Sequence, residues 1–177
     1  MRIIFLCLIL VSFVSAASEL QVYAKLFPKI LAYDYNLKDK LYGQTIHLGI
    51  LYDEHSHEEA KELGELIHLY NPEINGFGLR VLLIPAAQFA LTPPAVSALM
   101  IMGEPADPDI YRQVREFAVH KSIIVFALRM EDVREYATIG LFFGKSIRPI
   151  INKQLMIESG IRLKTTFLKF AKVYDDE

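Results

Sequence analysis

The chain has 177 residues, a net charge of −2 and 23% charged residues, which is typical of one globular domain. A small negative net charge argues against non-specific binding to nucleic acid or to an anionic membrane surface. The only cysteine is Cys7, so the chain cannot form a disulfide within itself.

The N-terminal residues have the three-part layout of a secretory signal peptide. Arg2 precedes an apolar run from Ile3 to Val14, and small residues follow at positions 15–18. A membrane-spanning helix needs about 20 apolar residues, and this run is shorter, although an uncleaved anchor is the alternative. We therefore predict a signal peptide over residues 1–17, with the mature protein beginning at Ala17 or Ser18. Cleavage would remove Cys7 and Arg2, and the loss of one positive charge would change the net charge from −2 to −3.

The remaining residues, 18–177, alternate apolar runs of strand length with segments of helical period. Such alternation predicts an α/β fold. Several runs are nearly continuous in Val, Leu and Ile, as expected when helices cover both faces of a strand. We predict one domain with a mostly parallel sheet of five or six strands, a C-terminal antiparallel hairpin and helices on both faces. The predicted strands are Thr45–Tyr52, Leu79–Ile84, Val96–Met102, Ser122–Leu128, Ala137–Phe143 and Ser146–Ile151.

Three helices are predicted before the hairpin. The first follows the apolar stripe over residues 20–31, and Pro28 should kink or end it. The second should begin at a capping box formed by Ser56 and Glu59 and end at Asn71. The third should begin with Asp107 as its cap and Pro108 in its first turn.

The C-terminal third should contain the hairpin and two short helices. Gly144 and Lys145 suit a type II′ turn, and Pro149 should confine its strand to a sheet edge because proline cannot donate to a ladder. Asn152 can cap a short helix that Gly160 ends. Thr165 can cap a last helix, whose sheet-facing side chains would be Phe167, Phe170, Ala171 and Tyr174.

The densest polar cluster, residues 53–59, follows the first predicted strand, where ligands often bind in open α/β folds. Asp53, His55 and His57 could hold a metal, but a solvated loop before a capped helix explains them equally. Ser56 lacks the glycines of a nucleophile elbow, and residues 75–78 form a turn before a strand, not a dinucleotide motif. We therefore expect no metal, no cofactor and no enzymatic activity, and we predict a binding or regulatory domain.

Four stretches near the C-terminus resemble the closing segment of the YfiR-like family of periplasmic proteins. They are residues 137–143, residues 150–152, the Glu158-Ser159-Gly160-Ile161-Arg162-Leu163 stretch and residues 167–172. Weaker similarity extends to residues 47–51, 98–103 and 122–125. The chain departs from the family pattern because it has no tryptophan and, once processed, no cysteine. The missing cysteines put redox sensing in doubt but do not bear on the fold.

The resemblance implies a periplasmic regulator that docks on the sensory domain of an inner-membrane signalling protein, typically a diguanylate cyclase or otherwise a sensor kinase, and represses it. It implies neither nucleic-acid binding nor a membrane-embedded mature chain, and leaves a homodimer open. The alternative is a small-solute-binding module that uses the crevice near Asp53 and Gly103.

The candidate partner- or ligand-binding residues within the matched segment are Asn152, Gly160, Arg162 and Phe167. Asn152 and Gly160 also have structural explanations, as a helix cap and a helix terminator. Arg162 has no such structural role in the pattern, so it could anchor an acidic ligand or partner or lie solvated at the surface. Phe167 is expected in the core. We further expect the hairpin edge and Arg162 to lie close together and to form the docking contact.

Overall fold

The computed structural model describes residues 19–92, 94–103 and 107–174. The predicted signal peptide, residues 1–17, lies outside this part of the chain. None of the helices in the described ranges is long and apolar enough to cross a membrane.

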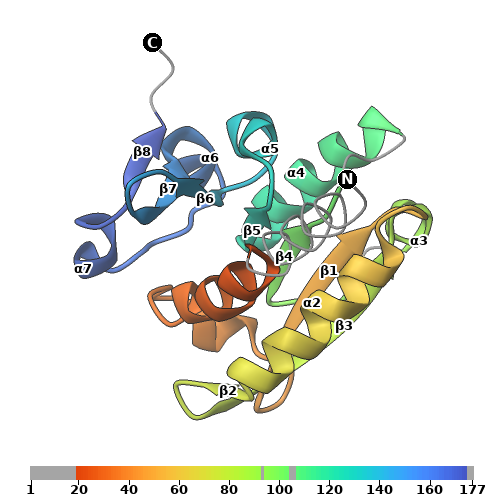
Figure 1. Cartoon of the computed structure of the whole chain (residues 1–177), viewed down its shortest axis with the longest axis horizontal. Coiled ribbons are helices and arrows are strands. Elements are labelled where there is room, and N and C mark those ends of the chain that lie inside the picture. The colour runs from red at the N-terminus through yellow and green to blue at the C-terminus, as the bar shows by residue number, and fades with distance from the viewer. Residues whose placement is uncertain (1–18, 93, 104–106, 175–177) are drawn as a thin grey trace, which may run out of the picture.

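Within the described residues, eight strands form one sheet in the order β2-β3-β1-β4-β5-β6-β7-β8 (Figure 1). The strands from β3 to β6 are parallel, β2-β3 and β6-β7 are antiparallel pairs, and β8 is parallel to β7. The predicted fold class is confirmed, although the strand count exceeds the predicted five or six. The strands are β1 (Thr45–Tyr52), β2 (Glu73–Ile74), β3 (Phe77–Pro85), β4 (Ala98–Ile101), β5 (Ile124–Ala127), β6 (Ile139–Phe143), β7 (Ile147–Asn152) and β8 (Lys172–Tyr174).

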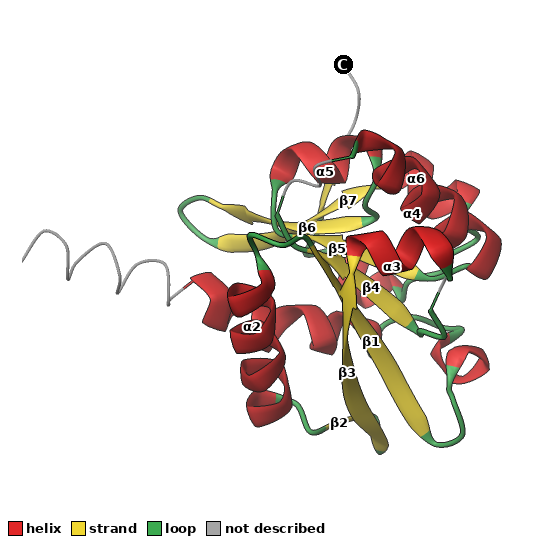
Figure 2. Cartoon of the chain, turned by 90° about the vertical axis from the view of Figure 1, so that its right-hand side faces the viewer, coloured by secondary structure: helices red, strands yellow, loops and turns green. Residues whose placement is uncertain are grey.

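Helices cover both faces of the sheet, as predicted. The N-terminal helix (residues 19–31) and α2 (His57–Tyr70) pack on one face, while α3 (Ala86–Leu91), α4 (Pro108–Lys121) and α5 (Met130–Glu135) pack on the other (Figure 2). The shorter elements are the 3₁₀ helix η1 (Leu37–Lys40), α6 (Lys153–Glu158) and α7 (Thr165–Leu168).

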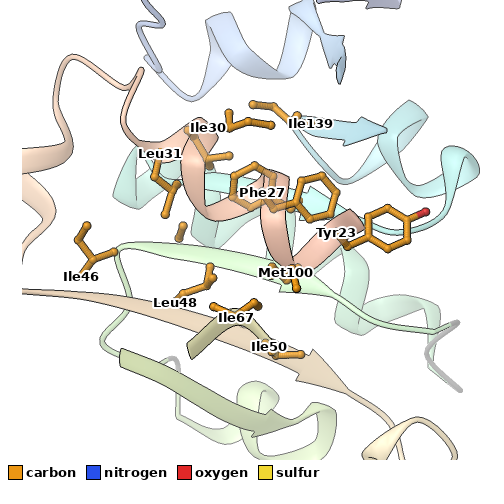
Figure 3. Packing of buried hydrophobic residues seen from close by; sticks show 14 of the residues in the cluster. Tyr23, Phe27, Ile30, Leu31, Ile46, Leu48, Ile50, Ile67, Met100 and Ile139 are labelled. Atoms are coloured by element: carbon orange, nitrogen blue, oxygen red, sulfur yellow. The ribbon is translucent and has the colours of Figure 1, made fainter. Parts of the chain in front are cut away.

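The two layers of helices explain why the central strands are apolar without alternation. In β4, Ala98 and Met100 point into the core under the N-terminal helix, whereas Leu99 and Ile101 point into the core under α4. Figure 3 shows the first of these cores, where Phe27 lies among side chains from several elements. Because successive strand side chains point to opposite faces, a strand buried on both sides needs apolar residues throughout.

The N-terminal helix continues to residue 31, so the prediction that Pro28 ends it is wrong. Proline at position 28 cannot donate the usual backbone hydrogen bond to the carbonyl of Ala24. The Asn71 side chain donates to that carbonyl instead, with an Nδ2–O distance of 2.8 Å. A residue 47 positions away thus satisfies the group that the proline leaves open.

The predicted starts of the second and third helices have different outcomes. Asp107 caps α4 through a hydrogen bond from the Asp109 amide, with Pro108 in the first turn, as predicted. Ser56 precedes α2 but makes no capping hydrogen bond, so the capping box is wrong. Its hydroxyl instead lies 2.7 Å from Asp53 Oδ1, because the preceding loop supplies a carboxylate acceptor.

The C-terminal third differs most from the prediction. Three residues, 144–146, link β6 to β7, and Gly144 is not among the residues with positive φ, so the type II′ turn is wrong. The last predicted helix ends at Leu168, with Lys164 and not Thr165 at its cap position, and residues 172–174 form β8. β8 pairs with β7, so the Pro149 strand is not the sheet edge. Pro149 avoids a conflict because the β7-β8 register begins one residue later, at Ile150.

Candidate functional site

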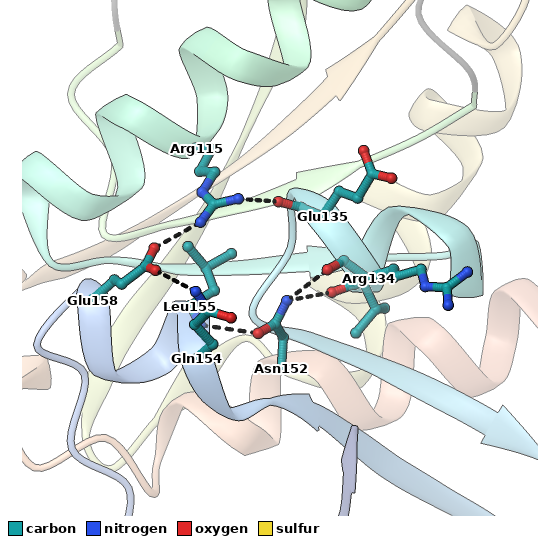
Figure 4. A network of polar contacts seen from close by, with 8 residues as sticks. Arg115, Arg134, Glu135, Asn152, Gln154, Leu155 and Glu158 are labelled. Carbon is teal, nitrogen blue, oxygen red and sulfur yellow. Dashed lines mark hydrogen bonds and ion pairs between the residues drawn. The ribbon is translucent and has the colours of Figure 1, made fainter. Parts of the chain in front are cut away.

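Asn152 connects three elements at the end of β7. Its Oδ1 accepts a hydrogen bond from the Leu155 amide at 2.9 Å and thereby caps α6, as predicted. Its Nδ2 donates to the carbonyls of Val133 and Arg134 in α5, at 2.9 and 3.0 Å (Figure 4). These contacts commit the buried amide to joining α6 to α5.

Replacing Asn152 with alanine should destabilise the protein by about 2–4 kcal/mol, because it removes a helix cap and leaves two carbonyls without a donor. Asn152→Ser is the matched control, since its hydroxyl oxygen can still cap α6 but its shorter side chain loses the hydrogen bonds donated to α5, and it should cost less than alanine. Urea unfolding of the three proteins measures these differences. Equal stability of the alanine variant and the wild type would show that these hydrogen bonds are not important for folding.

Gly160 and Phe167 occupy the structural positions that the sequence predicts. Gly160 has φ +64° just after α6, where the Ile161 amide donates to the Met156 carbonyl and closes the helix. Phe167 is buried in the core, with its ring centroid 5.3 Å from that of Tyr33. Whether either residue also contacts a partner stays a prediction.

Arg162 lies at the surface beside the segment that follows the N-terminal helix. Its guanidinium carbon is 5.7 Å from the centre of the Tyr35 ring, and its carbonyl accepts a hydrogen bond from the Tyr35 amide at 2.9 Å. The hairpin has other neighbours: Phe143 packs edge-on against Tyr23, and the Lys172 ammonium lies 3.8 Å from the Phe142 ring centre. In these contacts, Arg162 and the hairpin have no neighbour in common.

A small cavity lies beside Asp53 at the carboxyl ends of β1 and β4. Asp53 Oδ1 accepts hydrogen bonds from the amides of His55 and Ser56 and from the Ser56 hydroxyl. Burial acts to raise the pKa of Asp53, but the hydrogen bonds from Ser56 and His55 lower it overall. Tyr111 donates to the Gly103 carbonyl at 2.7 Å. The cavity left beside Asp53 is about 10 Å³, roughly the space of one water molecule.

The metal interpretation of the same loop has little geometric support. Among residues 19–92, 94–103 and 107–174, no three His, Cys, Asp or Glu side chains are grouped closely enough to hold a metal ion. His57 lies against the Tyr52 ring, with centroids 5.1 Å apart, and its Nδ1 is 3.4 Å from a Glu58 carboxylate oxygen. The expectation that Asp53, His55 and His57 hold no metal stays a prediction.

A larger groove, which we call the α6 groove, lies between α4, α5, α6 and β8. It has a volume of about 500 Å³, and Asn152 is the one candidate residue on its wall. Arg115 Nη2 is 2.7 Å from Glu158 Oε2, and Arg115 Nη1 donates to the Glu135 carbonyl (Figure 4). The hydrogen bond from Arg115, then that from Gln154, lowers the pKa of Glu158. The charged and aromatic residues of the groove are Arg115, Arg134, Glu135, Lys153, Glu158 and Tyr174.

The sequence gives little indication of the α6 groove. Its ion pair joins two residues 43 positions apart, Arg115 and Glu158, on helices that are not adjacent in the chain. Tyr174 was expected on a helix facing the sheet, but it lies on β8 and forms part of the groove wall. The one available signal was the capping role of Asn152, which predicted the start of α6.

Apolar side chains are exposed on the β6-β7 hairpin and in the segment that contains β8. Phe143, Ile147 and Val173 are 40%, 43% and 47% exposed, and Phe170, two residues before β8, is 73% exposed. In the strand register, Phe143 is paired with Ile147, and Val173 is paired with Ile151. Phe143, Ile147 and Val173 therefore lie on the same face of the sheet. We call these four residues the apolar edge. Across the described residues, β8 pairs with β7 on one side and with no strand on the other.

Comparisons with known proteins give the fold and no family. No protein-family model and no curated protein matches the sequence, so the YfiR-like resemblance stays a prediction. One similar solved structure is the ABC domain in complex with L-Trp from Streptococcus pneumonia, at 13% identity and a TM-score of 0.54, with 82% of this chain and 62% of that chain covered. Another is a conserved domain protein from Vibrio cholerae, at 16% identity and a TM-score of 0.55, with 87% and 59% covered.

These similarities concern the α/β fold alone, because both identities are low. The chain spans about 60% of the length of the two solved structures that it matches. The architecture is therefore one that occurs in known proteins, and the function has to be argued from the residues of this chain.

Proposed function

We propose that this chain is an exported regulatory protein that binds the periplasmic sensory domain of an inner-membrane signalling enzyme and lowers its output. The enzyme class, a diguanylate cyclase, comes from the YfiR-like resemblance of residues 137–172. The observation that carries the binding role is the apolar edge, which combines exposed apolar side chains with a strand, β8, that is paired on one side only in the described part of the chain.

An exposed sheet edge supports protein binding for a physical reason. The outer side of β8 presents backbone donors and acceptors that a strand of a partner can pair with. Exposed apolar side chains gathered beside such an edge usually mark an interaction surface, whereas single exposed ones are common on any protein. Val173 lies on β8 itself, and Phe143 and Ile147 lie on the same face of the sheet at the hairpin, whereas Leu69 is a single exposed apolar residue on α2.

Site-specific photocrosslinking in the native host tests this proposal. A photoreactive side chain at Val173 should crosslink to an inner-membrane protein that carries a cytoplasmic cyclase domain. The same group at Leu69, which is 70% exposed on α2, is the matched control and should give no such product. Equal crosslinking from both positions, or none from Val173, would contradict docking through the apolar edge.

Substitution of Arg162 tests whether the docking contact extends beyond the apolar edge. The charge reversal Arg162→Glu should leave thermal stability nearly unchanged, by about 0.5 kcal/mol or less, because the side chain is exposed. If docking reaches the Arg162–Tyr35 surface, this variant should also reduce the Val173 crosslink. An unchanged crosslink would confine the contact to the apolar edge.

A solute-binding module is the second candidate, favoured by one observation: a solved structure with the same fold contains bound L-Trp. The cavity that the described residues enclose beside Asp53 does not favour it, since about 10 Å³ is less than the space of an amino acid. If this alternative is correct, an amino acid such as L-tryptophan should raise the melting temperature of the purified protein.

A further inference from the structure

The α6 groove has the size of a small-molecule site and a mainly polar lining. Its volume, about 500 Å³, lies within the range of roughly 300–1,000 Å³ found for ligand pockets. Helices α4, α5 and α6 and strand β8 form its walls, and the Asn152 hydrogen bonds hold α5 and α6 together. The groove is therefore formed by packed helices and a strand and not by a loop.

The charges in the groove favour an anion. Three cations, Arg115, Arg134 and Lys153, face two carboxylates, Glu135 and Glu158. Arg115 is already paired with Glu158 at 2.7 Å. Among the described residues that line the groove, the three cations exceed the two carboxylates by one charge.

The Arg134 side chain is arranged to meet a ligand oxygen. Its guanidinium carbon lies 5.7 Å from the centre of the Tyr174 ring. The guanidinium is planar, and its N–H groups form a fork that matches two oxygens of a phosphate or carboxylate. Ile157 and the Tyr174 ring add apolar surface to the same groove.

We propose that the α6 groove binds a small organic phosphate or carboxylate. Arg134 and Lys153 bind its anionic group, and the apolar part of the ligand lies against Tyr174 and Ile157. Arg115 acts as a positioning residue, because its bonds to Glu158 and to the Glu135 carbonyl hold α6 against α4 and α5. This site shares β8 with the apolar edge but is lined by other residues, and it stands whether or not the chain regulates an enzyme.

Titration of the purified protein, followed by amide NMR shifts, tests the proposal with three probes: phenyl phosphate, benzoate and inorganic phosphate. Phenyl phosphate should shift the amides of residues 152–158 and 134–135 saturably and bind more tightly than inorganic phosphate, which lacks an apolar part. Benzoate distinguishes the ligand classes: if it binds as tightly as phenyl phosphate, the natural ligand is a carboxylate, and if it binds more weakly, a phosphate.

Two variants and a control make the result specific. Arg134→Gln should weaken phenyl phosphate binding at least about tenfold, because a charge-assisted hydrogen bond is lost. Lys153→Gln should weaken it to a smaller extent, and Arg148→Gln, the same change at an exposed arginine of β7, should leave it unchanged. Both groove variants change exposed side chains, and a melting curve checks their fold. Lack of saturation by every probe, or equal affinity in Arg134→Gln and Arg148→Gln, would overturn the proposal.

Discussion

Phe27→Ala should lower the free energy of unfolding by about 3–5 kcal/mol, as for other large aromatic residues removed from a core. The Phe27 side chain is fully buried, and its ring stacks between those of Phe126 and Tyr23, at centroid distances of 4.7 and 5.2 Å (Figure 3). It joins the N-terminal helix to the centre of the sheet, so its removal leaves a cavity between two elements that cannot close easily. Urea unfolding measures the loss.

Leu69→Ala is the matched control for the core variant, because it removes a side chain of similar chemistry from the exposed side of α2. Its effect should stay within about 0.5 kcal/mol. A loss below about 1 kcal/mol in Phe27→Ala would mean that the N-terminal helix does not pack on the sheet as described.

Lys40→Met should cost about 3–5 kcal/mol, because it leaves a buried carboxylate without its partner. The Lys40 ammonium is 2.5 Å from Asp34 Oδ2, and the two side chains are only 8% and 2% exposed. The other oxygen, Asp34 Oδ1, accepts a hydrogen bond from the Asn36 amide. Methionine retains much of the volume of lysine and removes the charge, so the loss reports the ion pair. Equilibrium unfolding in urea is the measurement.

Two further variants test the cause of this loss. Lys38→Met changes an exposed lysine in the same 3₁₀ helix, η1, and should have almost no effect. The double variant Asp34→Leu, Lys40→Met should recover at least half of the stability, because a buried ion pair can be replaced by apolar residues at little cost. If the double variant is as unstable as Lys40→Met, the loss comes from packing and not from the unpaired charge.

Local signals predicted much of the fold correctly. The stripe of helix α2, the Asp107-Pro108 start of α4 and the Asn152 cap each depend on residues within a few positions of one another. The six predicted strands are present, because each apolar run is long enough to be recognised in the sequence. β2 was missed because it has two residues, although its turn at Asn75 and Gly76, both with positive φ, was predicted as a turn.

Several of the features that failed depend on contacts distant in sequence, whereas the capping box failed locally because Ser56 bonds Asp53. The N-terminal helix continues past Pro28 only because Asn71 supplies the missing donor. The last segment forms β8 because β7 offers it a pairing edge, a condition that helical spacing in residues 167–174 cannot reveal. The α6 groove likewise requires contact between α4 and α6. The Arg115–Glu158 ion pair joins these helices in the folded protein. Nothing within a short window of sequence encodes these contacts.

Intracellular cyclic di-GMP in a deletion strain tests the central claim most directly. Deletion should raise cyclic di-GMP, and the wild-type gene should restore it. Val173→Asp, which places a charge on the apolar edge, should fail to restore it although the protein accumulates normally, while Leu69→Asp on α2 should restore it fully. Unchanged cyclic di-GMP after deletion, under conditions in which the protein is expressed, would contradict the account.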